Sequence, residues 1–147
     1  GDVQMVEEMS KVEVREFLMR STRTGKVATV REDGRPHIAP VWFVLDEDDR
    51  VIFTTWHETV KAANLRRDAR VSICVDDQQP PFSFVVIEGT AELEEQAQDM
   101  LDWTTRLARR YMGEDLADSY GKRNAVEGEL LVRVTPEKII ARKDLAD

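Results

Sequence analysis

The fold is decided by the stretch Gly25-Lys-Val-Ala-Thr-Val-Arg-Glu-Asp-Gly-Arg-Pro-His-Ile-Ala-Pro-Val-Trp-Phe-Val-Leu45. Its first part, residues 25–31, is short and rich in β-branched side chains, and its second part, residues 36–45, is another extended run. Asp33-Gly34 between them is a hairpin turn signal. We therefore expect two antiparallel strands joined by a tight turn.

Pro40 interrupts the second of these strands, because proline lacks the N–H group that a strand donates to its neighbour. Such a proline marks a sheet edge, a bulge or a place where the strand leaves its partner. It equally suits a surface that binds a ligand. The sequence leaves these interpretations open.

The rest of the chain adds further strands and a few helices. Gly89 lies within the longest strand, where a bend or bulge would let the sheet curl. Ser10 and Glu13 form a capping box at the start of the first helix. Strands joined mostly by turns are typical of a mainly β (α+β) fold, an antiparallel barrel with peripheral helices. The expected helices are residues 11–21, 58–68, 95–112 and 115–123, and the other strands are 50–55, 70–75, 82–94 and 129–134, with a terminal segment opening at Pro136 and a turn at 46–49.

Composition limits the protein to a few functional classes. A chain of 147 residues suits one domain, so we expect residues 1–147 to form a single unit. The net charge of −8 repels phosphate backbones and anionic lipid, which argues against nucleic-acid and membrane binding. Cys74 has no partner for a disulfide, and neither a signal peptide nor a long apolar run is present. We therefore expect a protein of the cytoplasm.

Most enzyme signatures are absent from the sequence. It has no Gly-rich phosphate loop, no G-x-S-x-G and no closely spaced His or Cys pair, so we expect no metal site. His37 and His57 are more typical of packing or capping residues than of catalysts. Cys74, in an apolar strand, is more typical of a buried thiol.

An anion site is indicated where the third strand runs into the second helix, within residues 53–67. Unpaired amide groups at a helix start carry partial positive charge, and the Thr54 and Thr55 hydroxyls with the Lys61 ammonium would complete a cradle. Lys61 and Asn64, three residues apart, share a helix face.

Residues 61–70 carry four basic side chains against one acidic side chain, a local excess of +3 in an acidic protein. Arg66, Arg67 and Arg70 belong to this group. The alternative is an ordinary solvated helix face. The tryptophans are similarly open to two interpretations, since Trp42, Trp56 and Trp103 either stack on a ligand ring or serve the core or an interface.

Four blocks of sequence resemble the pyridoxamine 5′-phosphate oxidase-like family of split barrels. They are residues 34–43, 51–55, 61–73 and 87–93, and their order and spacing cover most of residues 10–94. Asn64-Leu-Arg-Arg-Asp-Ala-Arg70 is similar to the branch that uses coenzyme F-420, a deazaflavin.

The resemblance implies an antiparallel split β-barrel of the FMN-binding type that forms a homodimer with the cofactor between the subunits. It implies that the ring and its ribityl-like chain lie along Ala39, Pro40, Val41 and Trp42, that Phe53, Thr54 and Thr55 lie near the chain and phosphate, and that Lys61 binds the phosphate. A longer anionic tail would use Arg66, Arg67 or Arg70.

Two departures from the family favour the deazaflavin. The FMN-binding oxidases usually have arginine where this chain has Ala39 and Val60. Losing two cations would weaken the hold on the FMN phosphate, because charge-assisted contacts are among the stronger polar interactions. The expected cofactor is therefore coenzyme F-420, with FMN as the alternative.

The expected function is oxidoreductase activity, with a hydride passing from reduced F-420 to a small conjugated or heteroaromatic substrate. Hydride transfer is the cofactor's own chemistry, so no side chain is assigned a catalytic role. The alternatives are an FMN-dependent oxidase or reductase and a non-catalytic protein that binds a flavin, a deazaflavin or haem.

Overall fold

The computed structural model describes residues 3–5 and 9–146. Its strands are β1 (Gln4–Met5), β2 (Gly25–Val30), β3 (Pro36–Val41), β4 (Val44–Leu45), β5 (Val51–Trp56), β6 (Arg70–Asp77), β7 (Ser83–Glu94) and β8 (Glu129–Arg142). They form one sheet in the order β3-β2-β6-β7-β8-β5-β4, in which each neighbouring pair is antiparallel. The short β1 pairs with β8 in parallel.

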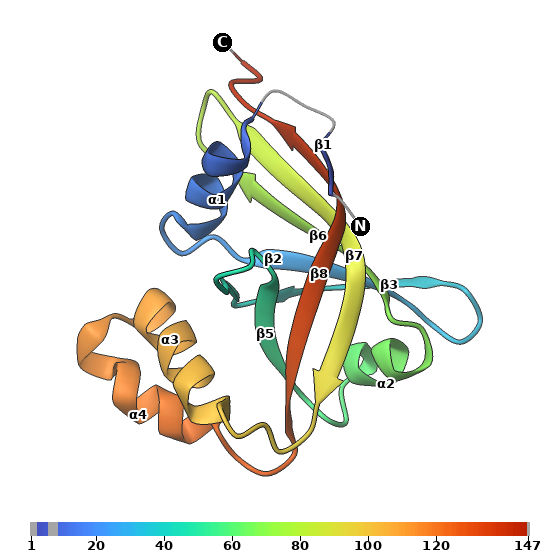
Figure 1. Cartoon of the computed structure of the whole chain (residues 1–147), viewed down its shortest axis with the longest axis vertical. Coiled ribbons are helices and arrows are strands. Elements are labelled where there is room, and N and C mark those ends of the chain that lie inside the picture. Colours follow the sequence, from blue (N-terminus) through green and yellow to red (C-terminus); the bar gives the residue numbers. More distant parts are fainter. Residues whose placement is uncertain (1–2, 6–8, 147) are drawn as a thin grey trace.

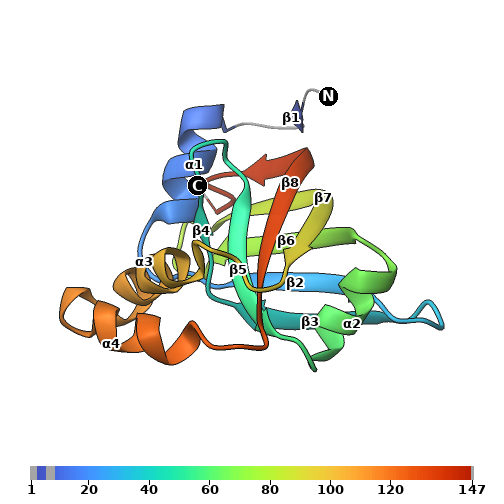
Figure 2. The same cartoon turned by 60° about the horizontal axis from the view of Figure 1, so that its bottom comes forward.

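The sheet curls strongly, so that β2 and β3 cross behind β8 (Figures 1 and 2). Its two end strands, β3 and β4, are consecutive in the chain and are separated by Trp42 and Phe43. The chain thus leaves the sheet at one end and rejoins it at the other. The expected antiparallel split barrel with peripheral helices is confirmed.

Residues 36–45 were expected to form one strand, and this expectation is wrong at Trp42 and Phe43. The Phe43 N–H donates to the Tyr111 hydroxyl at 3.1 Å, and the Phe43 carbonyl accepts from Arg110 at 2.6 Å. Helix side chains therefore take the place of a neighbouring strand at this residue. Pro40 lies on β3, an end strand that pairs with β2, where a missing N–H is tolerated.

The longest strand pair carries the expected bulge. The register of β7 against β8 shifts between Glu88 and Gly89, which pair with Lys138 and Pro136 respectively. A Cβ atom at Gly89 would overlap the Thr135 carbonyl oxygen, so glycine is required there.

The expected division of the last strand before Pro136 is wrong. β8 runs unbroken through the proline, because the bulge interrupts the ladder at that point.

The helices are α1 (Lys11–Met19), α2 (Val60–Arg67), α3 (Met100–Met112) and α4 (Glu114–Asn124). All four were expected, but some ends differ. α3 begins five residues later than expected, after turns. α2 begins at Val60 because Thr59 is its N-cap, and α1 has the expected capping box of Ser10 and Glu13. α3 and α4 lie together on one side of the sheet, and α2 lies on the other (Figure 1).

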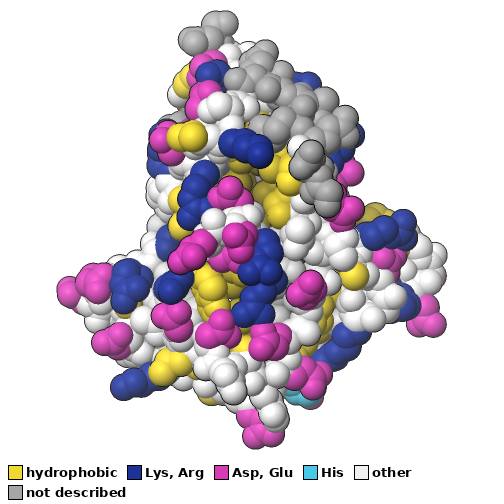
Figure 3. Space-filling view, in the orientation of Figure 1, with side chains coloured by type: hydrophobic (Ala, Val, Ile, Leu, Met, Phe, Trp, Pro, Cys, Tyr) yellow, Lys and Arg dark blue, Asp and Glu magenta, His cyan; other side chains and the backbone are white. Residues whose placement is uncertain are grey.

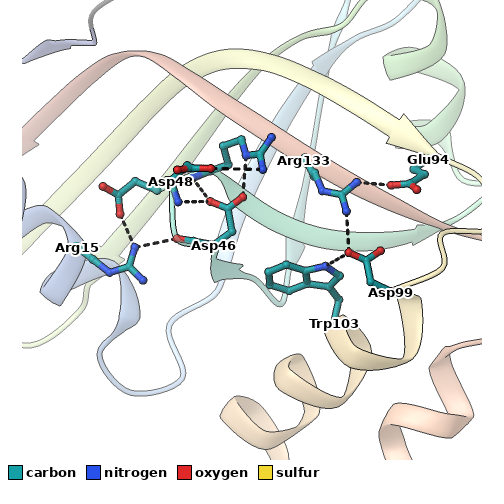
Figure 4. A network of polar contacts seen from close by, with 9 residues as sticks. Arg15, Asp46, Asp48, Glu94, Asp99, Trp103 and Arg133 are labelled. Carbon is teal, nitrogen blue, oxygen red and sulfur yellow. Dashed lines mark hydrogen bonds and ion pairs between the residues drawn. The ribbon is translucent and has the colours of Figure 1, made fainter.

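A polar network fixes α3 against the sheet. Arg133 on β8 forms ion pairs with Glu94 at the end of β7 and with Asp99, which precedes α3 (Figure 4). The same Asp99 carboxylate accepts the Trp103 indole N–H at 2.9 Å. Trp103 is buried among apolar residues of α3, β4 and β5 and is therefore a core residue.

The expected turn at residues 46–49 is confirmed and is held by Asp46. Its carboxylate accepts the backbone N–H groups of Asp48 and Arg50, both at 2.9 Å, and the Arg50 side chain at 2.7 Å. Arg15 on α1 donates to the Asp46 carbonyl at 3.0 Å (Figure 4). This network ties α1 to the end of the barrel away from α2.

On the face seen in Figure 3, charged side chains of both signs are mixed, with hydrophobic side chains showing between them. Within residues 3–5 and 9–146, no helix has both the length and the apolar character needed to cross a membrane.

Candidate functional site

A groove of about 340 Å³ opens where the ends of β3 and β5 meet the first turn of α2, the side of α3 and the start of β8. Its walls combine aromatic, hydroxyl and charged side chains. The lining residues are Pro40, Val41, Trp42, Thr54, Thr55, Trp56, Thr59, Lys61, Thr104, Leu107, Asn124 and Glu129.

The hydroxyl groups of the groove fix the start of α2. Thr55 and Thr59 share a hydrogen bond of 2.7 Å between their Oγ atoms. The Thr59 hydroxyl also accepts the backbone N–H of Ala62 at 3.2 Å, which caps the helix. Lys61 follows in the first turn, so these contacts set the position of its backbone.

Lys61 is half-buried in the groove wall. Burial lowers the pKa of its ammonium group, and the Glu129 carboxylate acts in the opposite direction. No hydrogen bond or ion pair to this ammonium is found in the described part of the chain. The groove therefore holds a cation that is available to an anionic ligand.

Glu129 faces the same groove, and the sequence did not point to it. Burial raises the pKa of this carboxyl group, while a hydrogen bond with the Thr54 side chain and the charge of Lys61 lower it. Glu129 opens β8 and is the register partner of Trp56 on β5. Only this long-range pairing brings Glu129 to Lys61, and the sequence carries no local signal for it.

Aromatic rings form another part of the groove wall. Trp42 stacks on Tyr111 of α3 with a centroid distance of 5.1 Å and an interplanar angle of 4°. The Tyr111 hydroxyl in turn donates to the Arg23 carbonyl at 2.7 Å. Trp56 is 41% exposed and tilts against His57. Two of the three candidate tryptophans thus line the groove.

The structure brings six of the candidate site residues into this groove. They are Pro40, Val41, Trp42, Thr54, Thr55 and Lys61. Ala39 precedes them on β3 and does not line the groove. The Phe53 side chain is fully buried in the core and does not line the groove.

The candidates on the rest of α2 have other partners. Asn64 is buried and donates to the Thr29 hydroxyl at 3.0 Å, which fastens α2 to β2. Arg67 donates to the Val30 carbonyl. Arg66 donates to the His57 carbonyl at 3.0 Å and borders a neighbouring groove of about 420 Å³. Glu129 lines both grooves.

The histidines and the cysteine do not form a catalytic cluster with these groups. The buried Nδ1 atom of His37 has no hydrogen-bond partner in the described residues. Burial lowers the pKa of His37, and Arg31 and Lys61 act in the same direction. Burial raises the pKa of the Cys74 thiol. Within the described residues, no group of three or more His, Cys, Asp or Glu side chains is arranged to hold a metal ion.

Part of this sequence is shared with a known reductase. The chain is 36% identical over 81 residues to the 5a,11a-dehydrotetracycline/5a,11a-dehydrooxytetracycline reductase of Streptomyces rimosus. The match covers 50% of this chain and 57% of the relative, so it spans little more than half the length of that protein.

Two solved structures have the same architecture. A conserved hypothetical protein of Mycobacterium tuberculosis superposes with a TM-score of 0.81 at 26% identity, covering 95% of this chain and 89% of the other. An F420 reductase superposes with a TM-score of 0.67 at 25% identity, covering 91% of this chain and 98% of the other. The sequence model of the pyridoxamine 5′-phosphate oxidase family matches residues 10–143. With this match over nearly the whole chain, the protein belongs to the pyridoxamine 5′-phosphate oxidase family of split β-barrels.

Proposed function

We propose that the protein is an oxidoreductase that transfers a hydride from reduced coenzyme F-420 to a small conjugated or heteroaromatic substrate. The observation that carries this proposal is the half-buried Lys61 ammonium in a groove that threonine hydroxyls and a stacked tryptophan also line. A cation, hydroxyls and an aromatic wall suit a cofactor that joins a planar ring to a phosphate. The kinship with two named reductases supports the same class of chemistry.

The residues of the groove fit such a cofactor. Lys61 and the Thr54 and Thr55 hydroxyls would hold the phosphate, and Pro40, Val41 and Trp42 would lie along the ring and its chain. The neighbouring groove shares Glu129 with the first groove and is bordered by Arg66. The longer tail of F-420 would run along this second groove, past Arg66. This path favours F-420 over FMN, as do the missing cations at Ala39 and Val60.

The protein's own part in catalysis is binding and alignment. When bound, the reduced deazaflavin supplies the hydride. Trp42 is kept in place by Tyr111, so one wall of the groove is preorganised for a planar ring. Leu107 and Val41 add apolar surface that excludes water from the substrate.

We further propose that two copies of the chain associate through the outer face of β3. Pro36, Ile38 and Pro40 are exposed on this face, and Ile38 is 65% exposed. Exposed apolar side chains gathered on one strand are typical of interaction surfaces. Pro40 also lines the groove, so a second subunit seated there would cover the cofactor.

The activity is tested by following the oxidation of chemically reduced F-420 with a panel of enones, quinones and nitroaromatics. We expect turnover with at least one class, and a raised KM for F-420 in Lys61→Ala. Lys11→Ala, an exposed lysine on α1, is the control and should behave as the wild type. Tight F-420 binding without turnover on any compound would favour a non-catalytic carrier, and turnover with FMN alone would favour the FMN enzyme.

A further inference from the structure

The groove proposed to bind an anionic cofactor also contains a carboxylate. Glu129 lines it together with Lys61, and both side chains are half-buried. A carboxylate repels a phosphate group at close range, and its effect is larger where water is partly excluded. Phosphate binding alone does not account for a carboxylate at this position.

We propose that Glu129 is a specificity-determining residue, which neutralises Lys61 in the ligand-free groove and makes the site favour a singly charged phosphodiester over a doubly charged phosphomonoester. This inference rests on the proposed function, because it concerns the anion that the same groove binds. It adds that the groove discriminates between phosphate ligands by their charge, and that anion binding is coupled to proton uptake.

The backbone of Glu129 is held in place by the sheet and by the preceding loop. Its register partner on β5 is Trp56, and its N–H donates to the Val126 carbonyl at 3.1 Å. The Gly128 carbonyl accepts the His57 N–H at 2.9 Å, and a Cβ atom at Gly128 would come within 2.7 Å of the Trp56 ring. Only the side chain of Glu129 is free to reorient, so the carboxylate stays near the anion site.

Lys61 is the cation that Glu129 can pair with. Among the elements packed around Glu129, β5 contributes the Thr54 hydroxyl, α2 contributes Lys61, and α3 and α4 contribute the uncharged Thr104 and Asn124. On the side of the neighbouring groove, the titratable or charged groups are His57, Arg66, Glu95 and Glu127. Arg66 is already paired with Glu95 at 3.4 Å.

The two groups hold each other in their charged forms. Burial alone raises the pKa of Glu129 and lowers that of Lys61, and each charge opposes the shift of the other. When a bound anion pairs with Lys61, the Lys61 charge no longer stabilises the Glu129 carboxylate. The anion also adds a second negative charge beside that carboxylate. The pKa of Glu129 then rises further, so anion binding is accompanied by proton uptake and weakens as the pH increases.

The unfavourable free energy of repulsion between Glu129 and a bound anion depends on the charge of the anion. A phosphomonoester such as that of FMN carries about −1.5 to −2 near neutral pH, whereas a phosphodiester carries a single negative charge. Coenzyme F-420 joins its ring and tail through a phosphodiester. Because Glu129 opposes the second charge of FMN most strongly, it selects for the diester at this position.

The binding experiment compares F-420, FMN and riboflavin, which has the flavin ring without the phosphate. Glu129→Gln should tighten FMN binding by about tenfold, F-420 binding by less, and riboflavin binding not at all. In the wild type, FMN affinity should fall with rising pH, and Glu129→Gln should flatten this dependence. Glu16→Gln, which neutralises an exposed carboxylate on α1 that lines neither groove, is the matched control and should resemble the wild type.

A second measurement needs no ligand. The side-chain carboxyl carbon of Glu129, followed by NMR, should titrate above the ordinary value of 4.5, and Lys61→Met should move the midpoint higher. Equal midpoints in both proteins, or equal effects of Glu129→Gln on FMN and riboflavin, would overturn the role of Glu129 while leaving F-420 binding intact. Failure of all three ligands to bind would overturn the cofactor site itself.

Discussion

Lys61 is the residue on which the proposed cofactor binding would depend most. Its ammonium is half-buried at the groove, and the opposing charge of Glu129 is its main electrostatic partner. A ligand phosphate would replace that partner with a direct charge-assisted hydrogen bond. This single side chain would therefore set the affinity for the cofactor. The packing of strands and helices forms the groove itself.

Lys61→Ala should weaken F-420 binding by about 1.5–3 kcal/mol, the range for a hydrogen bond to a charged group. Isothermal titration at fixed pH and salt measures the change. Lys11→Ala, which removes an exposed cation from α1, should leave the affinity unchanged. Unchanged affinity in Lys61→Ala would remove this lysine from the site.

Sequence patterns identified the part of the groove that is continuous in the chain. Thr54, Thr55 and Lys61 follow one another from the end of β5 into α2, so a strand running into a helix start was enough to single them out. Glu129, which lines the groove, and Tyr111, which stacks on Trp42 at its wall, were not identified, because each takes its place through packing between elements far apart in sequence. A single sequence does not encode such distances in any local pattern.

At the level of elements, β7 carries a bulge between Glu88 and Gly89, a feature that lets a sheet bend. Gly89 was identifiable from the sequence as a glycine inside a long strand. The continuity of β8 through Pro136 was not, because it depends on the bulge lying opposite that proline. The break at Trp42 and Phe43 was missed for a similar reason, since its hydrogen-bond partners lie on α3.

Gly89→Ala should destabilise the fold by about 1–3 kcal/mol, because the added methyl group overlaps the Thr135 carbonyl oxygen. Urea unfolding measures the loss. Glu88→Ala, at the exposed neighbouring position, should stay within about 0.5 kcal/mol of the wild type. Similar stability of the two variants would contradict the role given to the bulge.

Tyr111→Phe should cost about 1–3 kcal/mol, because the Phe43 N–H loses its acceptor at the break between β3 and β4. The ring remains, so stacking on Trp42 is retained. Tyr120→Phe is the matched control, since the Tyr120 hydroxyl makes no hydrogen bond within residues 3–5 and 9–146, and it should be near neutral. Equal unfolding free energies for both variants would refute this explanation of the break.

At the scale of the whole molecule, the proposed dimer would bury the exposed apolar face of β3, whose Pro40 lines the groove. Ile38 and Val12 are almost equally exposed, at 65% and 66%, but Val12 lies on α1, away from the groove. Exposure alone therefore does not show which of the two belongs to the proposed interface. Ile38 is assigned to it because β3 borders the groove.

Ile38→Glu should convert a dimer into monomers and weaken F-420 binding together with it, because a buried charge without a partner opposes association. Val12→Glu should do neither. Sedimentation velocity over a range of protein concentrations separates the two states. A wild-type protein that stays monomeric throughout, yet binds F-420 fully, would contradict the proposed interface.

The proposed F-420 site is tested most directly by a titration of the purified wild-type protein with F-420 and with FMN, side by side under the same conditions. We expect saturable F-420 binding that is tighter than FMN binding and is weakened in Lys61→Ala. Micromolar FMN binding without F-420 binding would contradict it.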